Sequence, residues 1–302
     1  MCCLFGIYDY GHSLTAAQKK RLVSALAVAS EDRGTDATGI AYNHSGHLTV
    51  YKRPYPAHLM RFKLPDDALC VMGHTRMTTQ GDEKHNYNNH PFEGTAGIPF
   101  ALAHNGVLYN DLTLRKDNNL PRTRIETDSY VAVQLLAQQG ALSFRSIRNA
   151  IEPLRGTLTL SILDNRDDLY IIKGNNPLTL YHFPRMGLYV YASTEQILKK
   201  GLKKGMPRME QPFEVMLREG DILRIDRQGR YTVERFDTRN LWDGTAHFSW
   251  PYWDVYAGQD EYINDLKSVA SAYGYTPHDI DVFLSYGLCP EEIEEIMCCG
   301  EV

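Results

Sequence analysis

The chain has 302 residues, of which 43% are hydrophobic and 23% charged, and its formal net charge is -5 at pH 7. These values are ordinary for globular proteins and exclude fibrous and disordered classes. No run of lysine and arginine is long enough to follow a phosphate backbone, so we expect no nucleic-acid partner. No apolar stretch has the length of a membrane span, and no secretory leader is recognisable. We therefore expect a soluble, cytoplasmic protein without a membrane partner.

The six cysteines stand at unusual places, because four of them form two vicinal pairs near the ends of the chain, at 2–3 and 298–299. This spacing is not that of a secreted disulfide framework. It also lacks the separation of two to four residues that zinc ligands favour. We expect neither a metal nor another cofactor, and we assign no role to Cys298 and Cys299.

The first half of the chain mixes short apolar segments with amphipathic ones. Leu4 to Tyr8 predicts a strand, and the apolar spacing from Ser13 to Asp32 predicts a helix. Residues 37–43 and 47–53 predict a hairpin, and residues 68–76 a strand that ends in polar residues. The polar stretch 78–91 that follows is expected to be a surface loop with a possible functional role.

The second half is expected to contain one more strand at 99–110, followed by helices at 127–139 and 143–154. Regularly spaced strands then predict an antiparallel meander, followed by a helix and a hairpin. In order, these segments are 157–164, 169–174, 178–183, 188–193, the helix 194–203 and the hairpin 221–237. Strands and helices in blocks, without strict alternation, indicate an α+β fold with helices outside.

Composition shifts near residue 240, where aromatic and polar residues without a clear period predict a linker at 240–258. The domains expected are therefore residues 2–239, this linker, and a small appendage at 259–302. Three short helices are expected in the appendage, at 259–273, 276–285 and 290–297. It faintly resembles three-helix adaptors of the ubiquitin-associated type. The alternative is that its last helix packs on the main domain with its acidic face in water.

The start of the chain, Met-Cys-Cys-Leu-Phe-Gly, carries the first chemical signal. Initiator methionine is readily removed before a residue as small as cysteine, which would leave a free amine and a thiol on Cys2. An α-amine titrates at about 7.7 to 8.0, so it can serve as the general base for its own thiol. The alternative for this feature alone is a buried N-terminal cysteine.

Six segments in order carry a resemblance to the class II glutamine amidotransferases, the glutaminase domains of N-terminal nucleophile hydrolase fold. The resemblance covers about residues 2–237. The segments are CCLFG (2–6), RGTDATGIA (33–41), GHTRMTTQG (73–81), NNHPF (88–92), AHNGVLYN (103–110) and ETDSYV (126–131). It implies a four-layer αββα sandwich with a small C-terminal helical appendage, and Cys2 as the nucleophile.

The resemblance also implies how L-glutamine would be held. Arg76 should bind the α-carboxylate through paired hydrogen bonds, and Asp128 the α-ammonium, so that the side-chain amide points at Cys2. Asn105 and Gly106 correspond to the oxyanion hole, although an isolated Asn-Gly is commonly a hairpin turn. Thr79 and His90 fall in the loop that folds over glutamine in the family. Their alternative is that of solvated loop residues.

The second segment, with Arg33, Gly34 and Asp36, is interpreted as structural: the glycine would allow a tight turn after the first helix, and the charged residues would tie the helix end to the sheet. Three positions depart from the family pattern. Cys3 replaces a glycine, Met77 an aromatic residue, and Gln80 a histidine. Cys3 raises the question of which thiol attacks. Methionine removal exposes only Cys2, so Cys2 is the predicted nucleophile.

These observations favour hydrolysis of glutamine to glutamate and ammonia through a Cys2 thioester. About 65 residues remain after the glutaminase segment, too few for an ordinary acceptor domain, so the ammonia acceptor is expected on a separate synthase protein. One alternative is an amidohydrolase acting on another γ-glutamyl amide. The other is a catalytically silent module for glutamine binding or assembly.

Overall fold

A computed structural model describes residues 2–207, 210–241, 263, 266–268, 270–285, 288, 293 and 296–297. By its internal contacts the chain divides into two compact units, Met1–Thr245 and Ala246–Val302. The first unit contains all the strands described and all the segments that carry the resemblance.

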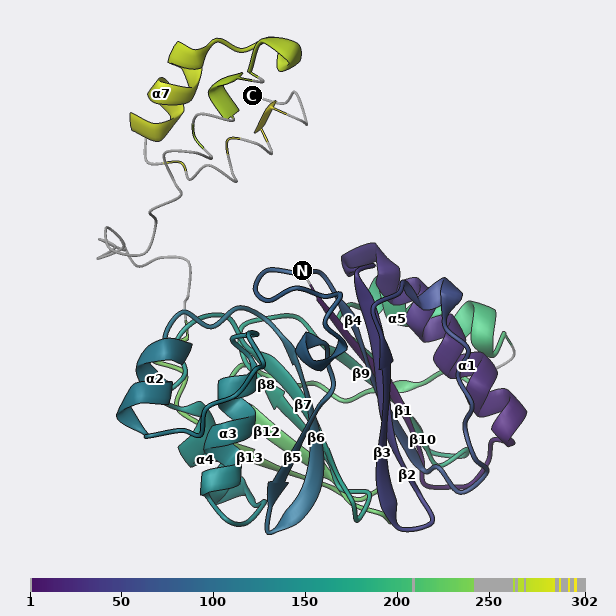
Figure 1. Ribbon diagram of the computed structural model, residues 1–302. Helices are drawn as coiled ribbons and strands as arrows, with labels where there is room; N and C mark the ends of the chain where they lie inside the picture. Colours follow the sequence, from purple (N-terminus) through teal and green to yellow (C-terminus); the bar gives the residue numbers. More distant parts are fainter. Residues whose placement is uncertain are drawn as a thin grey trace. The chain divides into compact units, whose positions relative to one another are not determined.

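Two antiparallel sheets form the centre of the first unit (Figure 1). One has the strand order β11-β9-β10-β1-β4-β2-β3, and the other β13-β12-β8-β7-β6-β5. The first sheet consists of β1 (Cys3–Asp9), β2 (Ala37–His44), β3 (His47–Arg53), β4 (Cys70–Arg76), β9 (Thr179–Phe183), β10 (Leu188–Ala192) and β11 (Phe213–Glu214). The second consists of β5 (Phe92–Ala96), β6 (Ile98–Asn105), β7 (Thr159–Asp164), β8 (Leu169–Lys173), β12 (Asp221–Ile225) and β13 (Tyr231–Arg235).

Helices cover the outer face of each sheet (Figure 1). The first sheet carries α1 (Ala16–Ala29) and α5 (Glu195–Gly205), and the second carries α3 (Tyr130–Gln138) and α4 (Phe144–Ile151). A shorter helix, α2 (Asp111–Asp117), contacts α3. The 3-10 turns are η1 (Ser30–Arg33), η2 (Ala57–Leu59) and η3 (Asn86–Asn88). Side-chain caps fix three helix starts: Thr15 for α1, Ser143 for α4 and Thr194 for α5.

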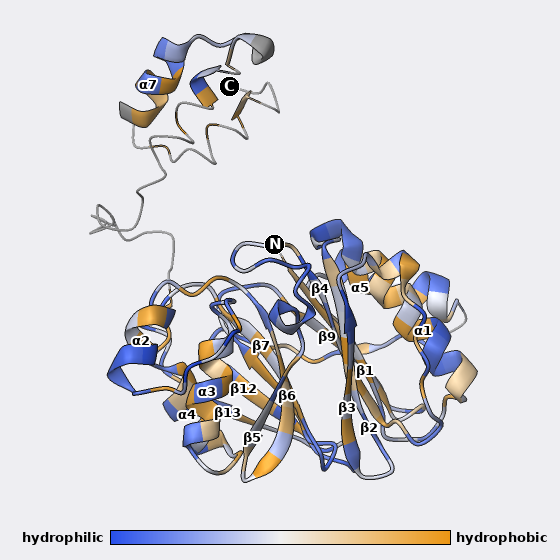
Figure 2. Cartoon of the chain, in the orientation of Figure 1, coloured by the Kyte–Doolittle hydropathy of each residue, from blue (hydrophilic) through white to orange (hydrophobic). Residues whose placement is uncertain are grey.

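The alternation of side chains along the strands produces the four layers. On β1, Cys3, Phe5 and Ile7 pack against the helices, whereas Leu4 and Tyr8 face the other sheet. On β6, Phe100 and Leu102 face the helices, and Ala101 and Ala103 face inward. Figure 2 shows hydrophobic residues concentrated along the strands and hydrophilic ones over loops and outer helix surfaces. Each sheet is therefore buried on both faces, which confirms the predicted αββα sandwich.

Some predicted elements differ from those observed. The strands at 157–193 do not form one meander, because β7 and β8 lie in one sheet and β9 and β10 in the other. The chain crosses between sheets after β8, where Leu158 N-H donates to Asn175 Oδ1 and Asn176 Nδ2 donates to the Asn105 carbonyl. Similar strand spacing does not reveal which sheet a strand joins. The short elements α2, β5 and β11 were not predicted.

The described part of the second unit contains η4 (Ala270–Tyr273) and α7 (Pro277–Ser285). Its small buried cluster contains Leu266, Ala270, Ile280, Ile293 and Met297. Most of the predicted linker 240–258, and much of the helices predicted at 259–273 and 290–297, lie outside the described residues. In the part of the chain that the structure describes, no helix combines the length and apolar character needed to cross a membrane.

We predict that Gly201→Ala destabilises the first unit, although alanine is the better helix former. A Cβ at position 201 would lie 2.6 Å from Leu26 Cδ2 and 3.0 Å from Leu26 Cα of α1. Overpacking costs about 1 to 3 kcal/mol, against a helix-propensity gain of about 1 kcal/mol. Urea unfolding should therefore give a lower stability for Gly201→Ala. Lys203→Ala, an exposed change on the same helix, should stay within about 0.5 kcal/mol of wild type, and an equal response of both variants would contradict the packing argument.

Candidate active site

Strand alternation brings three predicted residues to one end of the sandwich, between the sheets. Because side chains alternate between the two faces of a strand, Cys2 lies on the same face as Leu4 of β1. In the same way Arg76 shares a face with Met72 of β4, and Asn105 with Ala103 of β6. The start of β1 pairs with the end of β4, where Cys3 opposes Thr75, and both strands contact β6 of the other sheet. Cys2, Arg76 and Asn105 therefore share this inter-sheet edge, although they are far apart in sequence.

The Cys2 thiol is held by the segment that follows β4. Its Sγ donates to the Met77 carbonyl at 3.4 Å, and Arg33 Nε donates to the Cys2 carbonyl at 3.0 Å. Burial raises the pKa of the Cys2 thiol, while the charge of Arg76 lowers it and that of Asp128 raises it. Both charges are thus close enough to act on Cys2.

Cys3 has a different environment. Its side chain is completely buried in the cluster between the first sheet and helices α1 and α5, and its Sγ donates to the Leu4 carbonyl at 3.3 Å. Burial raises the pKa of this thiol as well. The two neighbouring thiols point to opposite faces of the sheet, and only Cys2 shares the inter-sheet face with Arg76 and Asn105.

The segment around Gly34 positions the candidate nucleophile and the loop beside it. Gly34 has φ 173°, an extended conformation, so it does not form the tight turn expected from the sequence. Glycine is needed here because there is no room for a side chain: a Cβ would lie 2.5 Å from the Arg76 carbonyl carbon. Asp36 accepts a hydrogen bond from Thr78 N-H at 2.6 Å. Arg33, at the end of η1, thus bonds to Cys2 directly before β1, and Asp36 bonds to the segment after β4.

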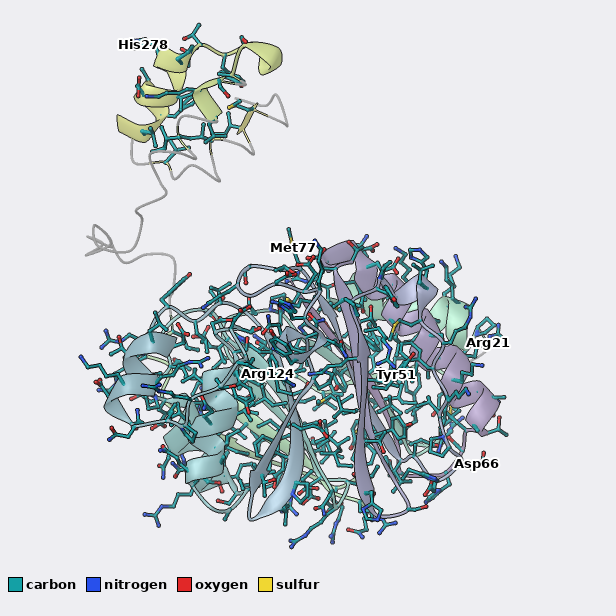
Figure 3. The ribbon with its side chains drawn as sticks, in the orientation of Figure 1. Arg21, Tyr51, Asp66, Met77, Arg124 and His278 are labelled. Atoms are coloured by element: carbon teal, nitrogen blue, oxygen red, sulfur yellow. The ribbon has the colours of Figure 1, made fainter. Side chains whose placement is uncertain are left out.

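Arg76 is 2% exposed, and its guanidinium organises the loop at 77–91. It donates to Asn89 Oδ1 at 2.6 Å and to the Gly81 carbonyl at 2.9 Å, as well as to the Gln80 carbonyl. Burial lowers its pKa, and the charges of Cys2 and Asp128 raise it. Met77, by contrast, is 51% exposed and projects from this end of the sandwich (Figure 3), so it does not line a buried pocket wall.

Asn88 fixes the same loop, a role that sequence reasoning missed although NNHPF was one of the matching segments. Its Nδ2 donates to Glu126 Oε2 at 2.8 Å and to the Asp82 carbonyl at 3.0 Å, and its Oδ1 accepts from Glu126 N-H. Its own carbonyl accepts from the Thr127 hydroxyl at 2.8 Å. One buried amide thus joins the loop to the residues just before Asp128.

Asp128 lies at the start of α3 and is 2% exposed. Its Oδ2 accepts from Leu108 N-H at 2.6 Å, and its Oδ1 from the Ser129 hydroxyl at 3.2 Å. These bonds connect it to the segment just after Asn105 and Gly106. A buried carboxylate with only one close main-chain donor keeps acceptor capacity for a cation.

Asn105 and Gly106 end β6. Asn176 Nδ2 holds the Asn105 carbonyl at 2.9 Å. Gly106 has φ 151°, and a Cβ would lie 2.0 Å from the Thr157 carbonyl oxygen and 2.5 Å from His104 Nε2. Only glycine fits this backbone, so the Asn-Gly pair here ends a strand and does not form a hairpin turn.

The two loop residues predicted to assist differ in their surroundings. Thr79 is exposed. His90 is buried, and its ring packs against His74 and Phe92 with centroid separations of 4.3 and 4.4 Å. Burial lowers the pKa of His90 far below its ordinary value and that of His74 to about 3, so both rings are neutral at pH 7. His90 thus belongs to an uncharged cluster beneath the loop.

Lys52 on β3 supports the loop from the side. Its Nζ donates to the carbonyls of Asn89 and Pro91 and lies 4.9 Å from the centre of the Phe92 ring. Burial, reinforced by the charge of Arg76, lowers its pKa to about 8, and only Glu93 opposes this change. Among the described residues, no group of three or more His, Cys, Asp or Glu side chains is arranged to hold a metal ion.

Two curated relatives show what this chain is similar to. The chain is 31% identical over 188 residues to a glutamine-fructose-6-phosphate aminotransferase [isomerizing] of Staphylococcus epidermidis, covering 59% of this chain and 30% of the relative. It is 34% identical over 158 residues to the Listeria monocytogenes protein of the same name, covering 50% and 26%. The chain is similar to class II glutamine amidotransferases. No model of a known protein family matches it.

Solved structures agree with this class II fold. Glutamine phosphoribosylpyrophosphate amidotransferase from B. subtilis has a TM-score of 0.60 at 20% identity, covering 79% of this chain and 50% of that one. An allosteric regulatory enzyme of purine biosynthesis has a TM-score of 0.61 at 20% identity, covering 78% and 49%. The chain spans less than a third of the length of these two curated relatives, so their full activities are not transferred to it.

The lowered pKa of Lys52 predicts a specific pH dependence of stability. Between pH 8 and 10.5 the unfolded chain keeps the Lys52 proton that the folded chain has lost, so the free energy of unfolding should rise with pH. In Lys52→Met this contribution is absent. The stability of wild type relative to Lys52→Met should therefore increase by at most about 3 kcal/mol across this window.

Urea unfolding at several pH values measures this difference. Lys63→Met, which removes an exposed lysine, should show a flat difference from wild type over the same window. If the difference in unfolding free energy between wild type and Lys52→Met does not change with pH, burial does not penalise the Lys52 ammonium.

Proposed function

We propose that this class II domain hydrolyses the side-chain amide of L-glutamine, with Cys2 as nucleophile once Met1 has been removed. The observation that carries the proposal is the shared position of Cys2, Arg76 and Asn105 at one inter-sheet edge, with Asp128 close enough to affect the Cys2 thiol. These groups supply what amide cleavage needs: a nucleophile, hydrogen-bond donors for the oxyanion, and charges for an amino-acid head group.

The reaction proceeds in two displacements. The Cys2 α-amine takes the thiol proton, and Sγ attacks the amide carbon to form a tetrahedral oxyanion. The Asn105 side-chain amide and Gly106 N-H stabilise that oxyanion. The C-N bond breaks, the α-ammonium returns the proton to the leaving nitrogen, and ammonia departs from a γ-glutamyl thioester. Water then attacks the thioester, which releases glutamate and restores the thiol.

Specificity comes from opposite charges. Arg76 binds the α-carboxylate, and Asp128 the α-ammonium. In the structure Arg76 bonds to the loop carbonyls of Gln80 and Gly81, so the same guanidinium links the closed loop to the substrate site. Thr79 contacts glutamine from this loop, and His90 is proposed to complete the site from the neutral cluster beneath it.

The ammonia acceptor is proposed to lie on a separate protein, beyond these 302 residues. The relatives are named glutamine-fructose-6-phosphate aminotransferases, and this chain matches only 26% to 30% of their length. Ammonia release from glutamine by the purified chain alone, without any acceptor, would support this division.

The alternative is hydrolysis of another γ-glutamyl amide, and the exposed Met77 at the site end favours it. Analysis of the products distinguishes glutamine hydrolysis from this alternative. Absence of both activities would favour the third hypothesis, a catalytically silent binding or assembly module.

The first experiment is labelling with 6-diazo-5-oxo-norleucine, a glutamine-mimicking electrophile, followed by intact mass and peptide mapping. We expect loss of Met1 and a single adduct on Cys2. Cys2→Ala should release no ammonia and take up no label. Retained Met1, or a folded wild type without an adduct, would contradict the proposed function.

The matched control is Cys3→Ala, which removes the neighbouring thiol that faces the helices. It should keep both labelling and ammonia release, at some cost in stability from the lost buried sulfur. Labelling at Cys3 in the wild type would mean that the reactive thiol is on the helix-facing side of β1. That result would reject Cys2 as the nucleophile.

The role proposed for Asp128 can be tested separately with Asp128→Asn. The new amide oxygen can still accept from Leu108 N-H, but the negative charge is gone. We expect the KM for glutamine to rise about 10- to 100-fold, the equivalent of a charge-assisted hydrogen bond. With 4-carbamoylbutanoate, which lacks the α-amine, wild type and variant should perform equally. A similar loss with both substrates would show that Asp128 serves only structure.

A further inference from the structure

Ser193 joins the candidate nucleophile strand to the oxyanion side of the site. It follows β10 directly and is completely buried. Its N-H donates to the Leu4 carbonyl at 2.9 Å, and its Oγ accepts from Leu4 N-H at 2.9 Å. Leu4 lies two residues after Cys2. The hydroxyl oxygen thus accepts one hydrogen bond from Leu4, and its proton can donate to a further acceptor.

The side chain of Asn105 lies next to this hydroxyl. Its Nδ2 is 3.5 Å from Ser193 Oγ, at the limit of a hydrogen bond, and its Oδ1 is buried without a hydrogen-bond partner among the described residues. A buried carbonyl oxygen without a partner is unfavourable, because it has lost its hydrogen bonds to water without gaining another. The two ends of an asparagine amide have nearly the same shape, and the hydrogen-bond network decides between them.

Exchanging the two ends of the amide gives its oxygen a hydrogen-bond partner. Oδ1 then faces Ser193 and accepts its hydroxyl proton, while Leu4 N-H continues to bond to Oγ. Nδ2 takes the buried position that Oδ1 occupied, where Asn105 has no hydrogen-bond partner among the described residues. In this orientation Nδ2 can donate to a developing oxyanion, which is what that intermediate requires.

We propose that Ser193 is a positioning residue that orients the Asn105 amide, by donating to Oδ1 and so directing Nδ2 toward the oxyanion. This inference rests on the proposed function and names a residue to which the family motifs assigned no role. Ser193 touches neither substrate nor the reacting atoms, and it acts only through Asn105.

One other acceptor lies beside Ser193. Burial raises the pKa of the Cys3 thiol, and hydrogen bonds with Ser30 and Ser193 oppose this effect. Sulfur is a weak acceptor, whereas an amide oxygen is a strong one. In addition, Cys3 Sγ already bonds to the Leu4 carbonyl as a donor. The Asn105 amide oxygen is thus the better partner for the Ser193 proton.

The kinetic consequence follows from when the oriented donor is used. Nδ2 gains its partner only as the tetrahedral intermediate forms, so its orientation affects the transition state more than the bound substrate. Loss of the Ser193 hydroxyl should lower kcat and leave KM for glutamine nearly unchanged. A residue that only supports the fold would not produce this separation.

The test is a double-mutant cycle of Ser193→Ala and Asn105→Ala in the full chain, read as ammonia release from glutamine. We expect Ser193→Ala to lower kcat about 10- to 100-fold with KM within about threefold, in the range of losing part of one oxyanion donor. In the Asn105→Ala background the same change should have almost no further effect, because its target is gone. Ser30→Ala, another buried serine beside Cys3, should keep kcat within about twofold.

Additive losses in the cycle, or a loss confined to KM, would overturn the inference. If Ser193→Ala does not fold, because Leu4 N-H loses its acceptor, Ser193→Cys replaces it in the same cycle. Its thiol is a weaker donor of similar size, so a smaller kcat loss that again vanishes without Asn105 is expected. A wild-type chain that releases no ammonia would reject the proposed function first, which keeps the two failures distinct.

Discussion

The site depends on the contact between two antiparallel sheets whose strands end at the same edge. Because side chains alternate along each strand, every second residue of β1, β4 and β6 must face the opposite sheet. In the middle of the sandwich these positions carry apolar residues such as Leu4, Met72 and Ala103. At the edge the same series continues into Cys2, Arg76 and Asn105. The register that buries the core therefore also assembles the site, and a slip of one residue would turn all three away.

The loop after β4 is the second feature on which the site depends, and its stability comes from buried amides. Asn88 and Asn89 bond to Glu126 and Arg76, so the loop, the start of α3 and the end of β4 form one connected network. The buried side chains of Asn88, Asn89 and Arg76 all have hydrogen-bond partners, which is the condition under which such networks rigidify a structure. Lys52 adds two bonds to the loop carbonyls from β3. Because the loop is rigidly supported, its hydrogen bonds hold the Arg76 guanidinium at the end of β4 in one orientation.

The sequence predicted the layered fold and the main strands, because their apolar patterns are strong and local. It did not predict that β7 and β8 separate from β9 and β10, since that choice depends on the crossover at Asn175 and Asn176 and not on strand pattern. For the site, the resemblance to the class II glutamine amidotransferases implied Cys2, Arg76, Asn105 and Asp128. The same motifs gave no role to Ser193, because its contacts run to Leu4, 189 residues away. Gly34 was read as a turn, whereas its neighbours across the sheet exclude a side chain.

Burial at the site explains why the nucleophile needs a base of its own. The pKa of the Cys2 thiol is raised, so at neutral pH the resting group is the thiol and not the reactive thiolate. The nearby histidines cannot serve as bases by changing charge near pH 7, because burial holds His74 and His90 neutral, and their rings pack in the cluster below the loop. An α-amine on the same residue fills this requirement, since it titrates close to neutral pH and lies within reach of its own sulfur. Removal of Met1 would then be the step that creates the base, and the surrounding fold would already hold the carbonyl of Cys2 in place through Arg33.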